Sequence, residues 1–105
     1  MNKWEVWKAV HESYEVPHFF VIISPPSLLS GPRVNALVCH TRRPVSEIQP
    51  YHVVLDQADG LEHPSLLICN YVFEVKRERL TMRAGVVTLG RRRAILERIM
   101  RAFST

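Results

Sequence analysis

The chain has 105 residues, with 14 Lys or Arg and 10 Asp or Glu, so its formal net charge is +4 with the histidines neutral. That length corresponds to one domain, residues 1–105. The contents of 47% hydrophobic and 23% charged residues exclude disordered, collagenous and coiled-coil classes.

Short strands separated by turns are predicted along the first half of the chain. Residues 4–10 are rich in strand formers, and residues 18–23 form a continuous apolar run typical of a buried central strand. Pro25 and Pro26 end this run, because proline cannot donate to a sheet ladder. Residues 34–40 are predicted to form the third strand.

Three more strands are predicted before the C-terminal segment. They cover residues 51–55, residues 65–72 with a continuation through residues 73–75, and a short piece at 85–87. Many short strands at roughly even spacing indicate a small barrel or a sandwich.

The last segment has the periodicity of a helix. Thr88 is a candidate N-cap, and the residues after it form an apolar stripe that we expect to pack in the core: Ile95, Leu96, Ile99, Met100 and Phe103. Arginines at positions 91–93 place positive charge at the positive end of the helix dipole. We hypothesise that an anion of a partner molecule compensates this charge.

The charges are unevenly distributed along the chain. Residues 1–75 carry five basic and eight acidic side chains, a balance of −3, whereas residues 76–105 carry nine basic and two acidic ones, a balance of +7. This asymmetry is compatible with a nucleic acid or an acidic protein as partner, or with a solvated basic helix face.

The sequence shows no pattern typical of a metal site, a membrane span or a signal peptide. Cys39 and Cys69 each lie in an apolar stretch, which favours buried, reduced thiols, and the five histidines show no metal-ligand spacing. The longest unbroken apolar run, residues 19–23, is far shorter than the ~18 residues of a membrane span. The first residues lack the apolar stretch of a signal peptide, so we expect a cytoplasmic protein.

The order of these features resembles the MazF/PemK (Kid) toxins of bacterial toxin–antitoxin pairs. The family pattern runs from a strand with E-V/I-W, through an R-P-x-x-V-I-S strand, a P-x-T turn and a G-L-x-x-x-S segment, to a V-x-C-D-Q strand. Its counterparts in this chain are residues 4–7, 18–24, 39–41, 60–65 and 66–71.

The resemblance implies a mainly β fold, a small SH3-like barrel similar to MazF and CcdB, with a C-terminal α-helix. It also implies a homodimer that cleaves single-stranded RNA or mRNA without a metal or cofactor, through a 2′,3′-cyclic phosphate, and that a cognate acidic antitoxin neutralises.

The family's catalytic positions are only partly matched. Thr41 corresponds to the family's threonine, with Arg42 behind it, whereas His18 replaces the arginine that opens the second strand. His11 and Glu12 are similar to a His-Glu pair of some PemK-like members. His18, Thr41, Arg42 and His11 are therefore the expected catalytic set, since histidine can donate or accept a proton near neutral pH.

Other positions complete the expected site. Arg33 and Arg43 are expected to bind RNA. Ile68 and Asn70 stand where family members have an arginine and a carboxylate around the cysteine. His40 is expected to point to the strand face opposite Thr41, so the two are not expected to act together. His52 and His63 are assigned no role.

Two alternatives to the nuclease remain open. The departures at His18, Ile68 and Asn70 favour a non-catalytic interaction protein, or a CcdB-like gyrase-poisoning toxin, on the same barrel. The basic C-terminal segment is explained equally well by an RNA-binding barrel that does not cleave RNA.

Overall fold

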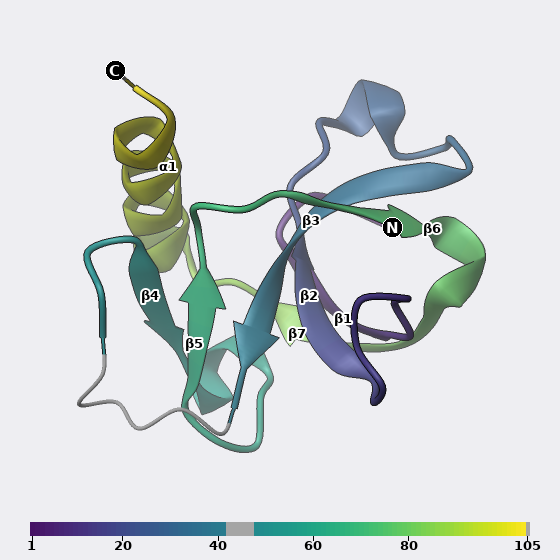
Figure 1. Cartoon of the computed structure of the whole chain (residues 1–105), viewed down its shortest axis with the longest axis horizontal. Coiled ribbons are helices and arrows are strands. Elements are labelled where there is room, and N and C mark those ends of the chain that lie inside the picture. The colour runs from purple at the N-terminus through teal and green to yellow at the C-terminus, as the bar shows by residue number, and fades with distance from the viewer. Residues whose placement is uncertain (42–47, 105) are drawn as a thin grey trace.

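The fold is built around one antiparallel sheet, shown by a computed structural model that describes residues 1–41 and 48–104 (Figure 1). Within these residues the sheet has seven strands, in the order β4-β5-β3-β2-β1-β7, and β6 also pairs with β3. The strands are β1 (Glu5–Ala9), β2 (His18–Ile22), β3 (Arg33–His40), β4 (His52–Leu55), β5 (Ser65–Ile68), β6 (Phe73–Lys76) and β7 (Leu80–Val86), followed by helix α1 (Leu89–Phe103). The predicted mainly β fold with a C-terminal helix is confirmed.

The strand predicted over residues 65–75 is in fact two strands. Cys39 is opposite Leu67 and Ala36 is opposite Phe73, so three steps along β3 correspond to six steps along the partner chain. The extra residues leave the ladder between β5 and β6, and Tyr71 becomes exposed there. Strand β7 is longer than the piece predicted at 85–87 because it pairs along the whole of β1.

Both faces of the central strands are buried, which explains why their sequences are continuous apolar runs. On β3, Val34 and Val38 pack on one face with Phe20, whereas Leu37 and Cys39 pack on the other. The core that contains Leu37 and Cys39 is closed by α1, which lies beside β4 in Figure 1. The core that contains Val34, Val38 and Phe20 lies beneath the candidate site described below.

Helix α1 buries less of its apolar stripe than predicted. Ile95 is fully buried and Ile99 packs against the core, but Leu96, Met100 and Phe103 are 44%, 71% and 57% exposed. The prediction of core packing is wrong for these three residues, because the helix contacts the sheet along one narrow side only.

Carboxylates of the same chain neutralise positive charge at the start of α1. Arg91 donates two hydrogen bonds to the Asp56 carboxylate, at 2.7 and 2.9 Å, and one to Asp59 at 2.6 Å. The Thr88 N–H donates to Asp59 Oδ1 at 3.0 Å, while the Thr88 hydroxyl makes no capping hydrogen bond. For Arg91, therefore, the hypothesis of a partner anion is wrong: the turn at Gln57–Asp59 and its N-cap Asp56 supply the negative charge.

The two cysteines are free and buried, as predicted. Burial raises the pKa of the Cys39 thiol far above its ordinary value and that of Cys69 to about 12. Among the described residues there is no group of three His, Cys, Asp or Glu that could hold a metal ion. In the same part of the chain, no helix has the length and apolar character needed to cross a membrane.

Candidate active site

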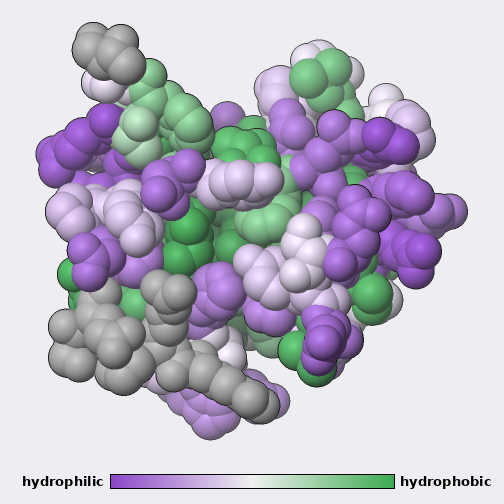
Figure 2. Space-filling view, viewed as in Figure 1, coloured by the Kyte–Doolittle hydropathy of each residue, from purple (hydrophilic) through white to green (hydrophobic). Residues whose placement is uncertain are grey.

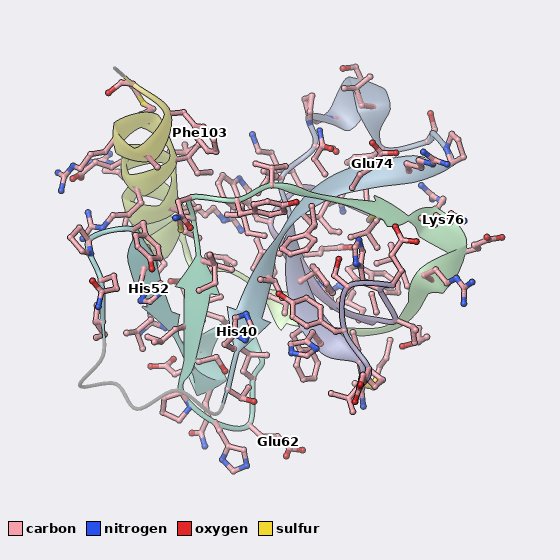
Figure 3. The ribbon with its side chains drawn as sticks, viewed as in Figure 1. His40, His52, Glu62, Glu74, Lys76 and Phe103 are labelled. Carbon is pink, nitrogen blue, oxygen red and sulfur yellow. The ribbon has the colours of Figure 1, made fainter. Side chains whose placement is uncertain are left out.

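Two histidines meet where β2 begins and β3 ends. The register pairs Phe20 with Val38 and Phe19 with Cys39, so the next step along the ladder brings His18 opposite His40. The two imidazole centroids are 5.4 Å apart, with the rings at 71° to each other, and both side chains are half-buried. Figure 3 labels His40 at this end of β3.

Tyr14, from the loop between β1 and β2, joins the two histidines. Its ring stacks on His18 with centroids 4.0 Å apart and an angle of 29° between the planes, and it meets His40 edge-on at 5.7 Å. The Tyr14 hydroxyl lies 3.4 Å from His40 Nε2. We refer to Tyr14, His18 and His40 as the His-Tyr-His cluster.

A backbone carbonyl next to His18 determines which ring nitrogen carries the proton in the neutral imidazole. His18 Nδ1 lies 2.9 Å from the carbonyl oxygen of Val16. Because a carbonyl oxygen only accepts, this contact places the proton on Nδ1, and in the neutral ring Nε2 then carries the lone pair. His18 is thus arranged to accept a proton at Nε2.

Tyr14 and His40 line a hollow of about 330 Å³ in which aromatic rings predominate, and His18 adjoins it through its stack on Tyr14. Its lining consists of Ser13, Tyr14, Val38, His40, Tyr51, Ile68, Asn70, Tyr71 and Phe73. Figure 2 shows apolar surface in the middle of this face, over β3 and β5, with hydrophilic residues crowded around β6. Flat rings at the rim of such a hollow are suited to stacking against unpaired bases.

His11 lies on the other side of Phe73 from the cluster. Its ring meets Phe73 edge-on at 5.1 Å, and Phe73 in turn lies 5.8 Å from Tyr14. His11 Nε2 is 3.2 Å from the Glu74 carbonyl oxygen, so this nitrogen donates when it carries the proton. The ring contacts that connect His11 with His18 therefore run through two other rings, those of Phe73 and Tyr14.

A second hollow, of about 400 Å³, contains His11 together with the expected RNA-binding residue Arg33. Arg33 Nη1 donates to Glu74 Oε1 at 2.6 Å, between two side chains that are more than half exposed. Lys76 and Arg79 also line this hollow, and within residues 1–41 and 48–104 neither forms an ion pair. Figure 3 labels Glu74 and Lys76 along β6.

The remaining sequence candidates have different outcomes. Thr41 is exposed and directly follows His40, the last residue of β3. Arg42 and Arg43 lie outside the described residues. Ile68 and Asn70, which the resemblance aligns with an arginine and a carboxylate, both line the 330 Å³ hollow.

Sequence reasoning missed His40 and Tyr14. His40 was set aside because it lies on the strand face opposite Thr41, although that face is the one it shares with His18. A usable signal existed: when consecutive strands pair antiparallel, the first residue of one lies near the last residue of the next. Nothing in the local pattern around Tyr14 indicates its contacts, because they depend on how the loop folds back.

Solved structures of a MazF toxin and of other toxins and endoribonucleases share the fold of this chain. An endoribonuclease in complex with its cognate antitoxin, from a mycobacterial species, superposes with a TM-score of 0.82 at 16% identity, covering 97% of this chain and 93% of that chain. The Mycobacterium tuberculosis toxin MazF-mt6 gives a TM-score of 0.80 at 18% identity, with 94% and 95% covered.

A further M. tuberculosis toxin gives a TM-score of 0.78 at 17% identity, covering 93% of this chain and 99% of that chain. No protein-family model matches the chain, and no curated protein matches it in sequence. At these identities the likeness is one of fold, and it confirms the MazF-like fold expected from the sequence.

Proposed function

We propose that this chain, residues 1–105, is a toxin-like endoribonuclease that cleaves single-stranded RNA, including mRNA in the cytoplasm, without a metal. The observation that carries the proposal is the half-buried His18, with Nδ1 held by the Val16 carbonyl, stacked on a tyrosine that lines an aromatic hollow. The MazF-type fold supports it.

The proposed reaction is an internal transfer at phosphorus. The ribose 2′-oxygen loses its proton to His18 and bonds to the adjacent phosphorus, while the bond from phosphorus to the 5′-oxygen breaks and that oxygen gains a proton. The products are a 2′,3′-cyclic phosphate and a 5′-hydroxyl. Thr41 and Arg42 are proposed to hold the phosphate as charge builds on its oxygens, and His11 belongs to the proposed set on the far side of Phe73.

Substrate binding is proposed to use stacking and charge together. Tyr51, Tyr71 and Phe73 offer ring faces to unpaired bases, and Arg33 and Arg43 are proposed to contact phosphates. Only RNA supplies the 2′-hydroxyl that the reaction needs, so DNA of the same sequence is expected to bind without being cut.

The nuclease proposal is tested with a long single-stranded RNA in EDTA. We expect discrete fragments that end in 2′,3′-cyclic phosphate, and we expect His18→Ala to lower the rate by about 10²–10⁴-fold, the usual contribution of a proton-transfer group. His63→Ala is the matched control, because His63 is exposed in a loop and does not line either hollow. Intact RNA at high wild-type concentration would rule out the nuclease.

An antitoxin and a second copy of the chain are the proposed partners. The mycobacterial endoribonuclease of the same fold is described in complex with its cognate antitoxin. The exposed cations Lys76 and Arg79 would attract an acidic, partly disordered antitoxin segment. Addition of the product of a neighbouring small acidic reading frame should abolish cleavage, and sedimentation should give a dimer at micromolar concentration.

A second candidate function is a non-catalytic interaction protein, or a CcdB-like toxin that has lost RNase activity. It is favoured by one observation: Ile68 and Asn70 line the hollow at positions where the resembled family has ionisable side chains. On this hypothesis RNA remains intact in EDTA and in Mg²⁺ alike, while the antitoxin still binds.

A further inference from the structure

We propose that His40 is the second catalytic residue of this site and that it protonates the leaving 5′-oxygen while His18 takes the proton from the 2′-hydroxyl. Tyr14 is the positioning residue for both rings. The inference rests on the proposed RNA cleavage and assigns the acid that the proposed reaction leaves open.

The separation of the two rings suits this division of work. The attacking 2′-oxygen and the leaving 5′-oxygen are bonded to the same phosphorus on opposite sides, so the base and the acid must flank a single phosphate. Each needs a nitrogen within about 2.6–3.2 Å of its oxygen. The imidazole centroids are 5.4 Å apart, and His40 lines the open hollow, so two such groups can act beside one phosphate bound there.

The reaction needs one group that takes a proton and one that gives a proton, and two neighbouring imidazoles can divide these roles. Among the described residues, the other titratable groups that line the hollow beside His40 are Tyr14 from the β1–β2 loop, Tyr51 before β4 and Tyr71 between β5 and β6.

No carboxylate is among the described residues that line the 330 Å³ hollow. Glu12 and Glu74 line the other hollow, beyond Phe73. The His18 Nδ1 contact with the Val16 carbonyl leaves Nε2 to act as the base. His40, the other imidazole of the pair, is then the group that can act as the acid.

Tyr14 fixes the geometry of the pair. It stacks on His18 at 4.0 Å, meets His40 edge-on, and brings its hydroxyl 3.4 Å from His40 Nε2. The arrangement also accounts for the uncharged Ile68 and Asn70, because a histidine pair across β2 and β3 performs both proton transfers from neighbouring strands.

The roles of the two histidines are distinguished by RNA in which sulfur replaces the leaving 5′-oxygen. A thiolate leaves without needing a proton, so loss of the acid does not slow this substrate. We expect His40→Ala to lose about 10²–10⁴-fold on ordinary RNA and to regain a near wild-type rate on the sulfur substrate. His18→Ala should be slow on both, and His63→Ala should resemble wild type on both.

The outcomes separate this inference from the proposed function. If wild type cleaves RNA and His40→Ala cleaves it equally fast, the nuclease stands and the assignment of His40 is wrong. Rescue of His18→Ala instead of His40→Ala would reverse the roles and overturn the assignment. If wild type leaves both substrates intact, the nuclease and the inference fall together.

A measurement independent of activity tests the pair itself. In NMR spectra, His18→Ala should shift the ring signals of His40, because the two rings are in edge-to-face contact. Unchanged His40 ring signals in a folded variant would contradict that contact. For Tyr14, Tyr14→Phe should keep most of kcat through the retained stack, whereas Tyr14→Ala should lower kcat more than it changes KM; equal effects of the two variants would contradict positioning by the ring.

Discussion

At the scale of single residues, the sharpest constraint is the contact between two glycines. Gly60 ends the turn at Gln57–Asp59 with φ +96°, and a Cβ there would lie 2.4 Å from the Ala84 carbonyl oxygen and 2.7 Å from the Gly85 Cα. The turn that carries Asp56 and Asp59 therefore sits directly on β7. Any side chain at position 60 would separate the two segments.

Gly60→Ala should accordingly destabilise the protein by at least about 2 kcal/mol, from the left-handed backbone alone at about 1–2 kcal/mol and from the clash in addition. Gly90→Ala is the matched control, because nothing lies within 4 Å of a Cβ at that position in α1. It should be neutral or stabilising by up to about 1 kcal/mol. Urea unfolding of both variants measures the difference, and equal midpoints would contradict it.

A second residue-scale prediction concerns Arg33, which shares a hollow with His11 and pairs with Glu74. If RNA phosphates are bound there, Arg33→Ala should weaken binding of a non-cleavable 2′-O-methyl RNA and lower the slope of log K against log salt by up to about 0.7. Arg101→Ala, whose partner is Glu97 on α1, serves as control. If both variants give the same slope of log K against log salt, Arg33 does not contact RNA phosphates.

At the scale of elements, the attachment of α1 to the turn before β5 decides how the C-terminal segment is held. Asp59 is fully buried and accepts from both Arg91 and the Thr88 N–H, so the helix start is fixed by one carboxylate. Hydrogen bonding to Arg91 lowers the pKa of Asp56 below its ordinary value. Arg91 thus forms its ion pairs within the molecule, so we do not expect it to bind a ligand.

Arg91→Ala should cost about 2 kcal/mol, because it leaves the buried Asp59 carboxylate without its cation while Arg91 itself is partly exposed. Arg101→Ala, which breaks an exposed pair four residues apart, should cost about 0.5 kcal/mol or less. Thermal unfolding compares the two variants. Equal losses of unfolding free energy would show that the ion pair with the buried Asp59 stabilises the protein no more than an exposed pair does.

The pH dependence of this attachment has a defined sign. Since the pKa of Asp56 is lower in the folded than in the unfolded chain, its contribution is complete above the unfolded value, about 4, and is lost as the pH falls through the folded value. The gap in stability between wild type and Arg91→Ala should therefore narrow below about pH 4. A gap that widens on acidification would contradict the assigned charges.

At the scale of the whole molecule, the charge distribution and the site occupy different parts of the chain. The basic segment 76–105 supplies α1, whose arginines are partly used internally, as with Arg91 on Asp56 and Asp59 and Arg92 on the Val87 carbonyl. The His-Tyr-His cluster comes instead from residues 14–40, in the half of the chain with a negative balance. The candidate chemistry is therefore located by the aromatic and histidine side chains, and the basic segment is not its centre.

The sequence by itself determined what local patterns control. Continuous apolar runs predicted buried strands, prolines and glycines predicted where they end, and an apolar stripe predicted a C-terminal helix. The buried thiols of Cys39 and Cys69 and the resemblance to MazF followed from the same local information. His18 became a candidate site residue in this way, because the resembled family's pattern marks its position at the start of a strand.

Tertiary structure alone decided what depends on register between distant segments. The pairing of β2 with β3 brings His18 to His40, and the break between β5 and β6 exposes Tyr71 beside the hollow. The carboxylates that neutralise Arg91 come from residues more than thirty positions away. Which side chains meet across a ladder changes with a shift of one residue, and that shift is fixed by packing on both faces of the sheet rather than by any local pattern.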